Sequence, residues 1–134
     1  MSDASVDKNI ETVRRFYDAG PADDDTDRYP FASPDIVWHV PGANRVSADY
    51  RGVSEVFDTM PRLMQPLDEW HMEVLAVMGN RDLVTAFVHL RGARGDHRVD
   101  CDGGHVFRMD ADGRIAEAWG FVDDQAGLDA LLDA

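Results

Sequence analysis

The stretch GHVFRMDADGRIAEAW, residues 104–119, has the pattern of a β-hairpin and decides the fold class of this chain. Strand-like segments flank the turn-forming residues 110–113 (DADG), and apolar residues alternate with other residues before the turn. Alternate side chains of a strand face opposite sides, so one face of 99–109 carries Val99, Cys101, Gly103, His105, Phe107 and Met109. That face is apolar, and we expect it to look inward and to take His105 with it.

Further strand patterns precede this hairpin, and helical patterns lie toward both ends of the chain. EWHMEVLAVM (69–78) and DLVTAFVHLR (82–91) flank Gly79-Asn80, which is a hairpin signal. Helical spacing of apolar residues marks 7–19, and an acidic helix is predicted over 123–133. Helices first and an antiparallel sheet afterwards predict one α+β domain over residues 1–134. We expect the sheet to curl around the first helices and to leave a pocket between them.

The stretch DIVWHVPGAN, residues 35–44, predicts a strand that ends at Pro41-Gly42. Its tryptophan face carries Ile36, Trp38 and Val40. His39 lies on the other face with Val37, so burial of the tryptophan face predicts that His39 is exposed. That inference weakens if both faces of the sheet are covered. His39 is therefore either a working group in a pocket or a polar residue between hydrophobic neighbours.

The segments around this strand have loop and helix patterns. The acidic stretch 22–34 contains two prolines and predicts a short helical turn and a loop. Residues 43–52 also have a loop pattern and lead into a helical segment from about Val53. Pro61 and Pro66 are predicted to bend or end that helix, because proline cannot donate the helical hydrogen bond.

Composition indicates a globular intracellular protein. The chain has 134 residues, 44% of them hydrophobic, which is enough for one substantial core. It has no run of about 18 apolar residues, so no membrane span is expected. The polar N-terminus lacks the features of a signal peptide, and the single cysteine excludes an internal disulfide. A cytoplasmic location is the expectation that follows.

The charge is strongly acidic, with a formal net value of −13 at pH 7. Most acidic residues are aspartates, and every basic residue except Lys8 is an arginine. This charge argues against nucleic acid and anionic membranes as partners, because phosphate contacts need clustered cations. The composition fits either a salt-rich cytoplasm, where ions screen self-repulsion, or a high-GC genome that favours arginine.

Most other polar residues have structural interpretations. His71 and His89 lack a Cys, His or Asp partner at ligand spacing, so neither a metal nor a cofactor is expected. Gly103-Gly104 lies within a strand and favours close packing or room for a ligand over a phosphate loop. His105, among Cys, Phe and Met on its face, is either a hydrogen-bonded core residue or an acid/base group of the pocket.

The whole chain resembles the SnoaL-like branch of the nuclear transport factor 2 superfamily. The resemblance is carried by VRRFYDAG in the first helix, PDIVWHVPG in the first strand, YRG before the later helix, and GHVFRMDADGRIAEAW. It implies a cone-shaped α+β barrel, in which a curved antiparallel sheet wraps on helices around a deep apolar pocket, usually in a homodimer. This fold hosts isomerases, hydrolases, cyclases and non-enzymes, so the fold alone does not define the activity.

None of the family's three catalytic sets that we compared is intact in this sequence. The tyrosine of ketosteroid isomerases falls on Val13, their protonated acid on His105, and their general-base aspartate near His39. The arginine and aspartate of limonene-epoxide-hydrolase-like enzymes fall on Gly103 and His105. The aspartate of SnoaL-type cyclases falls on Gly120. Two positions that the family uses for chemistry are therefore histidines here.

The leading hypothesis is a cofactor-independent enzyme of the isomerase or cyclase type, acting on a small apolar carbonyl or polyketide-like molecule. His39 and His105 would be its acid/base groups, because histidine titrates near neutral pH, and an apolar pocket would lower both pKa values. The residues expected to contact the ligand are Tyr17, Val37, Phe57, Met64, Cys101, Gly103, Ala118, Gly120 and Val122. The alternative is a non-catalytic small-ligand-binding or dimerisation module of the same fold.

Overall fold

The computed structural model describes residues 3–19 and 30–134. Its N-terminal part contains α1 (Asp3–Asp18), β1 (Ala32–Val40) and β2 (Ala48–Arg51), followed by a helix in three parts: α2 (Gly52–Ser54), the π-helical turn η2 (Glu55–Thr59) and α3 (Met60–Met64). Four strands and a C-terminal helix follow: β3 (Glu69–Asn80), β4 (Leu83–Arg94), β5 (His97–Met109), β6 (Ile115–Val122) and α4 (Gln125–Leu132). Residues 20–29 lie outside the described residues, and with them most of the turn and loop expected in 22–34.

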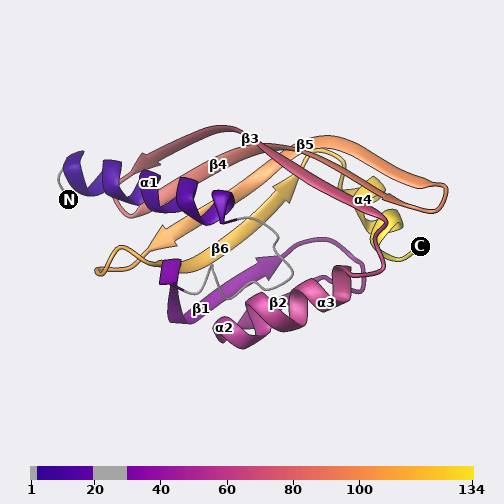
Figure 1. The fold of residues 1–134 in the computed structure, drawn as a ribbon, viewed down its shortest axis with the longest axis horizontal. Coiled ribbons are helices and arrows are strands. Elements are labelled where there is room, and N and C mark those ends of the chain that lie inside the picture. Colours follow the sequence, from indigo (N-terminus) through magenta and orange to yellow (C-terminus); the bar gives the residue numbers. More distant parts are fainter. Residues whose placement is uncertain (1–2, 20–29) are drawn as a thin grey trace.

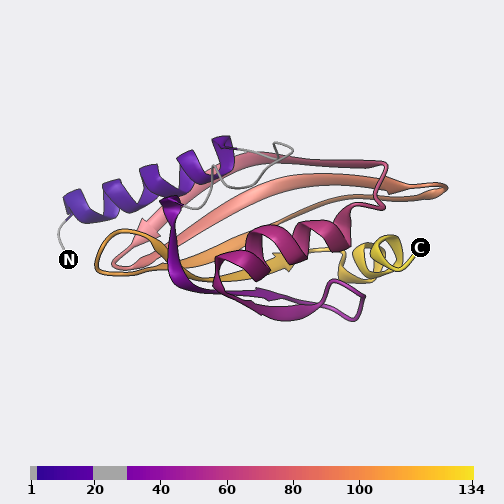
Figure 2. The same ribbon diagram turned by 60° about the horizontal axis from the view of Figure 1, so that its bottom comes forward.

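The strands form one curved sheet in the order β2-β1-β6-β5-β4-β3. All neighbouring strands are antiparallel except β1 and β6, which run parallel. Within the described residues the sheet does not close, because β2 and β3 remain its two edges. Figures 1 and 2 show α1 along one end of the sheet, the α2–α3 helix beside β1, and α4 at the opposite end from α1. The predicted α+β class and the curved sheet on helices are confirmed.

The core lies between α1, the α2–α3 helix and the inner face of the sheet. Val13 and Phe16 of α1 are buried against Trp38 and Phe107, and the Phe16 and Phe107 ring centroids are 5.9 Å apart. Burying these aromatic and branched side chains is the main favourable contribution to folding. The alternation of β5 is as expected, with Val99, Cys101, Phe107 and Met109 all buried.

The hairpin between β3 and β4 turns two residues later than the sequence indicated. Gly79 and Asn80 are paired strand residues, opposite Val84 and Leu83. The turn lies at Arg81-Asp82, where Arg81 adopts a left-handed φ of 56°. A bulge between Val74 and Ala76 inserts one residue into β3 and shifts its register. The strand therefore includes the dipeptide that resembled a turn and ends at Asn80.

One other local prediction is corrected, and the structure decides between the two outcomes, a bend or an end of the helix, predicted for Pro61. Residues 48–51, expected within a loop, form the edge strand β2, which pairs with the end of β1. Pro61 does not end its helix: the helix widens by one π turn just before it, where the Met60 amide donates to the Glu55 carbonyl. The chain then continues as α3 to Met64. A wider turn accommodates a residue that lacks an amide hydrogen.

Among the described residues, no helix combines the length and the apolar character that crossing a membrane would require.

Candidate functional site

A cavity of about 790 Å³ lies between the inner face of the sheet and the helices. Its wall receives residues from α1, β1, the α2–α3 helix, β3 to β6 and α4. Seven of the predicted site residues line it: Tyr17, His39, Phe57, Met64, His105, Gly120 and Val122. Most of the remaining wall is aromatic or aliphatic, with Trp38, Trp70, Leu90 and Leu128 among its members. A concave apolar cavity with a few polar groups is the usual form of a small-molecule site.

The central polar feature of this cavity is a hydrogen bond between Tyr17 and His105. The Tyr17 hydroxyl lies 2.5 Å from Nδ1 of His105. Tyr17 lies near the C-terminal end of α1. His105 points inward from β5 because it is two residues from the buried Phe107 and lies on the same face of the strand. The His105 ring packs edge-on against Trp38, with centroids 5.1 Å apart. Aromatic packing around the pair fixes the orientation of the imidazole.

Only one hydrogen can lie between the hydroxyl oxygen and Nδ1. Which of the two groups donates it depends on the tautomer of His105. When the hydroxyl donates to Nδ1, the ring carries its hydrogen on Nε2 and can donate there. When Nδ1 carries the hydrogen and donates to the hydroxyl oxygen, Nε2 has a lone pair and can accept a proton. The pair can therefore act as an acid or as a base at Nε2.

His39 does not join this pair. It borders the cavity, but its ring lies on the outer face of the sheet, whereas Trp38 and His105 lie on the inner face. His39 Nδ1 is 2.6 Å from the Asp49 carboxylate, and Nε2 is 2.6 Å from the Glu117 carboxylate. The expected convergence of the His39 and His105 rings is therefore not observed: both residues border the cavity, but the His39 ring lies on the outer face, as strand alternation predicted, with its side chain 27% exposed.

The electrostatics of His39 also differ from the expectation for an apolar pocket. The hydrogen bond to Glu117 is the main reason why the pKa of His39 is raised, and the Asp49 carboxylate adds to it while burial opposes it. The same bond is the main reason why the pKa of Glu117 is lowered, with Arg108 acting in the same direction. The ring also stacks on Trp119, with an interplanar angle of 17°. His39 of β1 thus binds one carboxylate from β2 and one from β6, and so connects the three strands.

Four residues expected to contact a ligand lie outside the cavity lining. Val37 is on the outer face, in register with Glu117. Cys101 is packed in a second buried cluster, and burial is the main reason why the pKa of its thiol is raised. Gly103 and Ala118 are covered by neighbouring strands: a side chain at Gly103 would overlap the carbonyl oxygen of Phe121, and Ala118 is fully buried. For Cys101, Gly103 and Ala118, an inward-facing position in a strand was therefore not sufficient to place the residue at the cavity.

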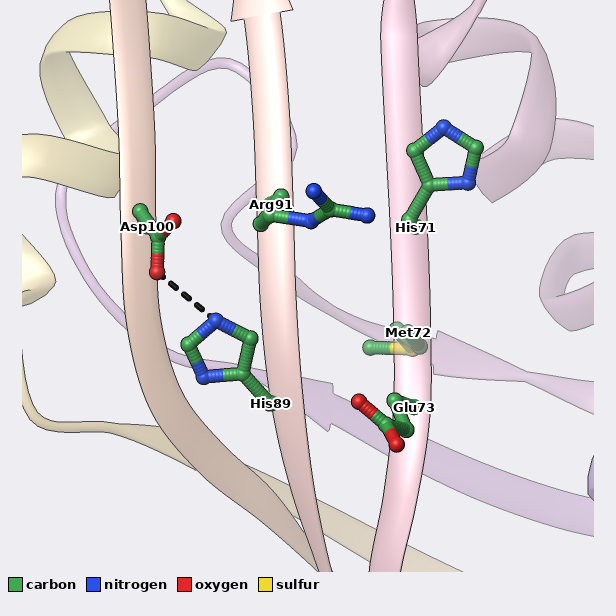
Figure 3. A pocket seen from close by; sticks show the side chains of 6 residues that line it. All are labelled: His71, Met72, Glu73, His89, Arg91 and Asp100. Carbon is green, nitrogen blue, oxygen red and sulfur yellow. Dashed lines mark ion pairs between the residues drawn. The ribbon is translucent and has the colours of Figure 1, made fainter.

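A second hollow lies on the outer face and is open to solvent. Figure 3 shows its lining: His71, Met72, Glu73, His89, Arg91 and Asp100. His89 Nε2 is 2.7 Å from Asp100, and its Nδ1 is 2.7 Å from Asp102. The bond to Asp102 is the main reason why the pKa of His89 is raised. Asp100 and Asp102 lie on the face of β5 opposite to His105, and their shared partner His89, for which no Asp partner was found at ligand spacing in the sequence, comes from the adjacent strand β4.

Neither site contains a cluster of metal ligands. Within residues 3–19 and 30–134, no three His, Cys, Asp or Glu side chains converge as a metal centre would require. Asp68, an acidic member of the cavity wall, accepts a hydrogen bond from the Gly95 amide. The inner cavity offers an apolar enclosure and an acid/base pair, which is the more suitable arrangement for a small organic ligand.

The fold class that these elements define is nuclear transport factor 2-like, and comparisons with known proteins agree: an NTF2-like protein from Burkholderia pseudomallei is 20% identical, with a TM-score of 0.82 over 100% of both chains. The model of the SnoaL-like domain matches residues 13–118. The chain therefore belongs to the SnoaL-like family, whose fold serves cyclases, isomerases and hydrolases. No curated protein sequence matches the chain.

Solved structures give the same result for the fold. Bal32a from a soil-derived mobile gene cassette is 25% identical, with a TM-score of 0.86 over 96% of this chain and 98% of that one. A putative SnoaL-like polyketide cyclase from Jannaschia sp. CCS1 is 21% identical, with a TM-score of 0.75 over 100% and 98%. An LEH-like epoxide hydrolase from M. tuberculosis is 20% identical, with a TM-score of 0.69 over 95% and 91%.

Proposed function

We propose that this protein is a cofactor-independent acid/base enzyme, of the isomerase or cyclase type, in which His105 moves a proton and Tyr17 positions it. The observation that carries the proposal is the 2.5 Å hydrogen bond between these two residues in the wall of a largely apolar cavity. Such a cavity excludes water from the ligand, while His105 Nε2 supplies one strong polar contact. His39 has no part in this step, because both of its ring nitrogens bind carboxylates on the other face.

The proposed chemistry begins with proton removal next to a carbonyl group. Nε2 of His105 accepts the proton from the carbon, while Nδ1–H donates to the Tyr17 hydroxyl oxygen. The C–H electron pair passes into the enolate, and the imidazolium returns the same proton at another carbon to complete an isomerisation. For a cyclisation, the enolate carbon instead attacks a second carbonyl of the same molecule, and the resulting alkoxide takes the proton. Both sequences balance without a cofactor.

The comparisons support this choice of substrate at the level of class. One structural neighbour is described as a putative SnoaL-like polyketide cyclase, and a polyketide is by its chemistry a molecule with several carbonyl groups. A ligand of this kind is flat and largely apolar and carries acidic C–H bonds, which suits the aromatic wall and the imidazole. A small apolar carbonyl or polyketide-like molecule is therefore the proposed substrate.

Hydrogen–deuterium exchange tests the proposal without knowledge of the natural substrate. The protein would be incubated in D2O with a panel of cyclic diketones and conjugated enones, and exchange at the α carbon followed by NMR. We expect catalysed exchange with at least one compound, and its loss in His105→Ala with the melting temperature lowered by only a few degrees. His97→Ala, at an exposed position away from the cavity, is the matched control.

The alternative function, a non-catalytic ligand-binding protein, predicts a different outcome of this experiment. Apolar carbonyl compounds would bind in the cavity and be recovered without deuterium beyond the uncatalysed background. A marked loss of stability in His105→Ala, with no exchange in the wild type, would identify His105 as a hydrogen-bonded core residue.

We also propose that the outer face of the sheet binds a second copy of this chain. Its centre carries large exposed side chains, among them Leu83, Phe87, Trp119 and Phe121, with exposures between 37% and 44%. Phe87 and Phe121 pack edge to face across Gly104. Charges of both signs flank this apolar band, including Asp100 and an Arg91 that has no ion pair among the described residues. A face with both signs of charge is self-complementary about a two-fold axis, which favours a copy of itself as the partner.

A further inference from the structure

Three glycines in neighbouring strands of the sheet differ in what a side chain would meet. A Cβ at Gly103 would overlap the carbonyl oxygen of Phe121, and one at Gly104 would overlap the carbonyl oxygen of Ala86. Glycine at these two positions allows backbones to approach closely. Both are therefore explained by packing of the sheet alone.

Gly120 has no such requirement. Its φ lies outside the left-handed region, so its backbone conformation is open to other residues. A Cβ built there would lie 3.4 Å from Cδ of Pro41, 3.7 Å from Cδ2 of His105 and 4.0 Å from Nε2 of His105. These are distances at which carbon atoms touch without overlap. The fold would accept an alanine at this position. Packing of the sheet therefore does not explain why residue 120 is a glycine.

This space adjoins the reactive edge of His105. His105 and Gly120 are direct partners in the β5–β6 register, and both line the cavity. One carbon atom at the Cβ position would already touch Pro41 on one side and the imidazole edge on the other. The gap is thus about one atomic layer thick, which is the thickness of a conjugated ring or a planar carbonyl group.

We propose that Gly120 is the specificity-determining residue of the cavity: by leaving this gap, it admits a flat, conjugated, oxygen-bearing edge of the ligand to His105. The inference rests on the proposed role of His105 and narrows its substrates to enones, enolised diketones and phenols. Saturated ring systems, whose carbon atoms project above and below the ring, are excluded from the gap. The other end of the ligand is free to vary along the apolar wall.

Binding of defined probes tests this inference. Dissociation constants of 2-naphthol and naphthalene would be measured by equilibrium dialysis for the wild type and Gly120→Ala. We expect the wild type to prefer 2-naphthol by about tenfold, as one hydrogen bond in an apolar site provides, and Gly120→Ala to lose this preference. Val122→Ile, which adds one methylene two residues along the same strand, should affect both probes alike.

The possible results separate the two proposals. A preference retained in Gly120→Ala overturns the role of Gly120 and leaves that of His105 intact. Absence of a preference in the wild type overturns the role of Gly120, and the exchange experiment then decides that of His105. A preference lost in Gly120→Ala, together with no catalysed exchange of any carbonyl compound, supports the gap and contradicts the enzyme. A melting temperature lowered by more than about 5 °C in Gly120→Ala would show that the glycine is structural after all, and would overturn the inference.

A second measurement needs no variant. The saturated analogue decahydro-2-naphthol has a similar outline and hydroxyl group but is thicker than 2-naphthol. The wild type should bind it at least about tenfold more weakly, because its ring does not fit a gap of one atomic layer. Equal affinity for the two alcohols would contradict the proposed flatness of the site.

Discussion

The hydroxyl of Tyr17 bonds Nδ1 of His105 at 2.5 Å and joins α1 to β5 across 88 residues of sequence. This contact places an acid/base pair in the wall of the cavity, between the aromatic side chains Trp38 and Phe107. It also makes the first helix part of the candidate site. A change at Tyr17 should therefore alter the behaviour of the imidazole as well as the packing of the helix.

Tyr17→Phe should lower the rate of catalysed exchange by about tenfold or more, because the hydroxyl that holds the His105 tautomer is lost. The phenyl ring retains the contacts with Phe16 and Phe107, so the free energy of unfolding should fall by only about 1 kcal/mol. The 15N chemical shifts of the His105 ring report the tautomer directly and should change as well.

Tyr50→Phe is the matched control for this experiment. Tyr50 is buried and its hydroxyl donates to the Val46 carbonyl at 2.6 Å, so the same chemical change removes a hydrogen bond elsewhere. It should reduce stability and leave the His105 ring shifts unchanged. If Tyr17→Phe alters neither the shifts nor the exchange rate, the positioning role of Tyr17 is wrong.

His39 should contribute to stability in a pH-dependent way. Its pKa in the folded protein is raised above the ordinary value of 6.5, mainly by the bond to Glu117. The protonated ring donates to two carboxylates, so its contribution is complete below about pH 6.5 and is lost as the pH rises through the raised pKa. The difference in unfolding free energy between wild type and His39→Asn should be about 1 kcal/mol at pH 6 and shrink toward pH 9.

Urea unfolding at a series of pH values measures this difference. His97→Asn, at an exposed position that begins β5, controls for the removal of a histidine as such. A difference that grows with pH would contradict the assignment of a protonated His39. Loss of catalysed exchange in His39→Asn, without loss of stability, would instead restore His39 as a candidate catalytic group.

The two carboxylates around His89 should have unequal effects on its pKa. The side-chain bond to Asp102 is the largest cause of the raised value, and Asp100 acts mainly through its charge. Asp102→Asn should therefore lower the pKa of His89 more than Asp100→Asn does. An NMR titration of the His89 ring measures both changes, and the reverse order would contradict the bonding described for this hollow.

The outer-face dimer predicts a change of assembly in Phe121→Asp. Phe121 packs against Phe87 at the centre of the exposed apolar band, so a carboxylate there would have to lose its hydration in an interface. Light scattering should find a dimer for the wild type at micromolar concentration and a monomer for the variant. Ala111→Asp, in the exposed turn between β5 and β6, should remain dimeric. A monomeric wild type would remove the proposed dimer.

Salt should stabilise the protein, because its formal net charge is −13 and ions screen the repulsion between carboxylates. We expect the melting temperature to rise by several degrees between low salt and molar KCl. An unchanged melting temperature would count against adaptation to a salt-rich cytoplasm and favour a genomic origin of the arginine-rich, lysine-poor composition.

Local patterns in the sequence were sufficient for the faces of most strands. The two-residue period of an extended chain depends only on the backbone, so it correctly placed His105 inward and His39 outward. The resemblance to the family predicted His39 at the pocket, and His39 does border the cavity, but its ring lies on the outer face between Asp49 and Glu117. Positions shared with relatives give the location of a Cα atom, whereas the direction of the side chain follows from the alternation of this chain's own strand.

The partners of these residues depended on the tertiary structure. Docking of α1 on the sheet brings Tyr17 to His105, and the parallel pairing of β1 with β6 brings Glu117 to His39. Strand register likewise decides that Gly120 faces the His105 edge while Gly103 lies against a backbone carbonyl. Such contacts join residues distant in sequence, and they are set by the packing of whole elements. The sequence by itself determined which side chains face inward, and only the packed fold decided which of them meet.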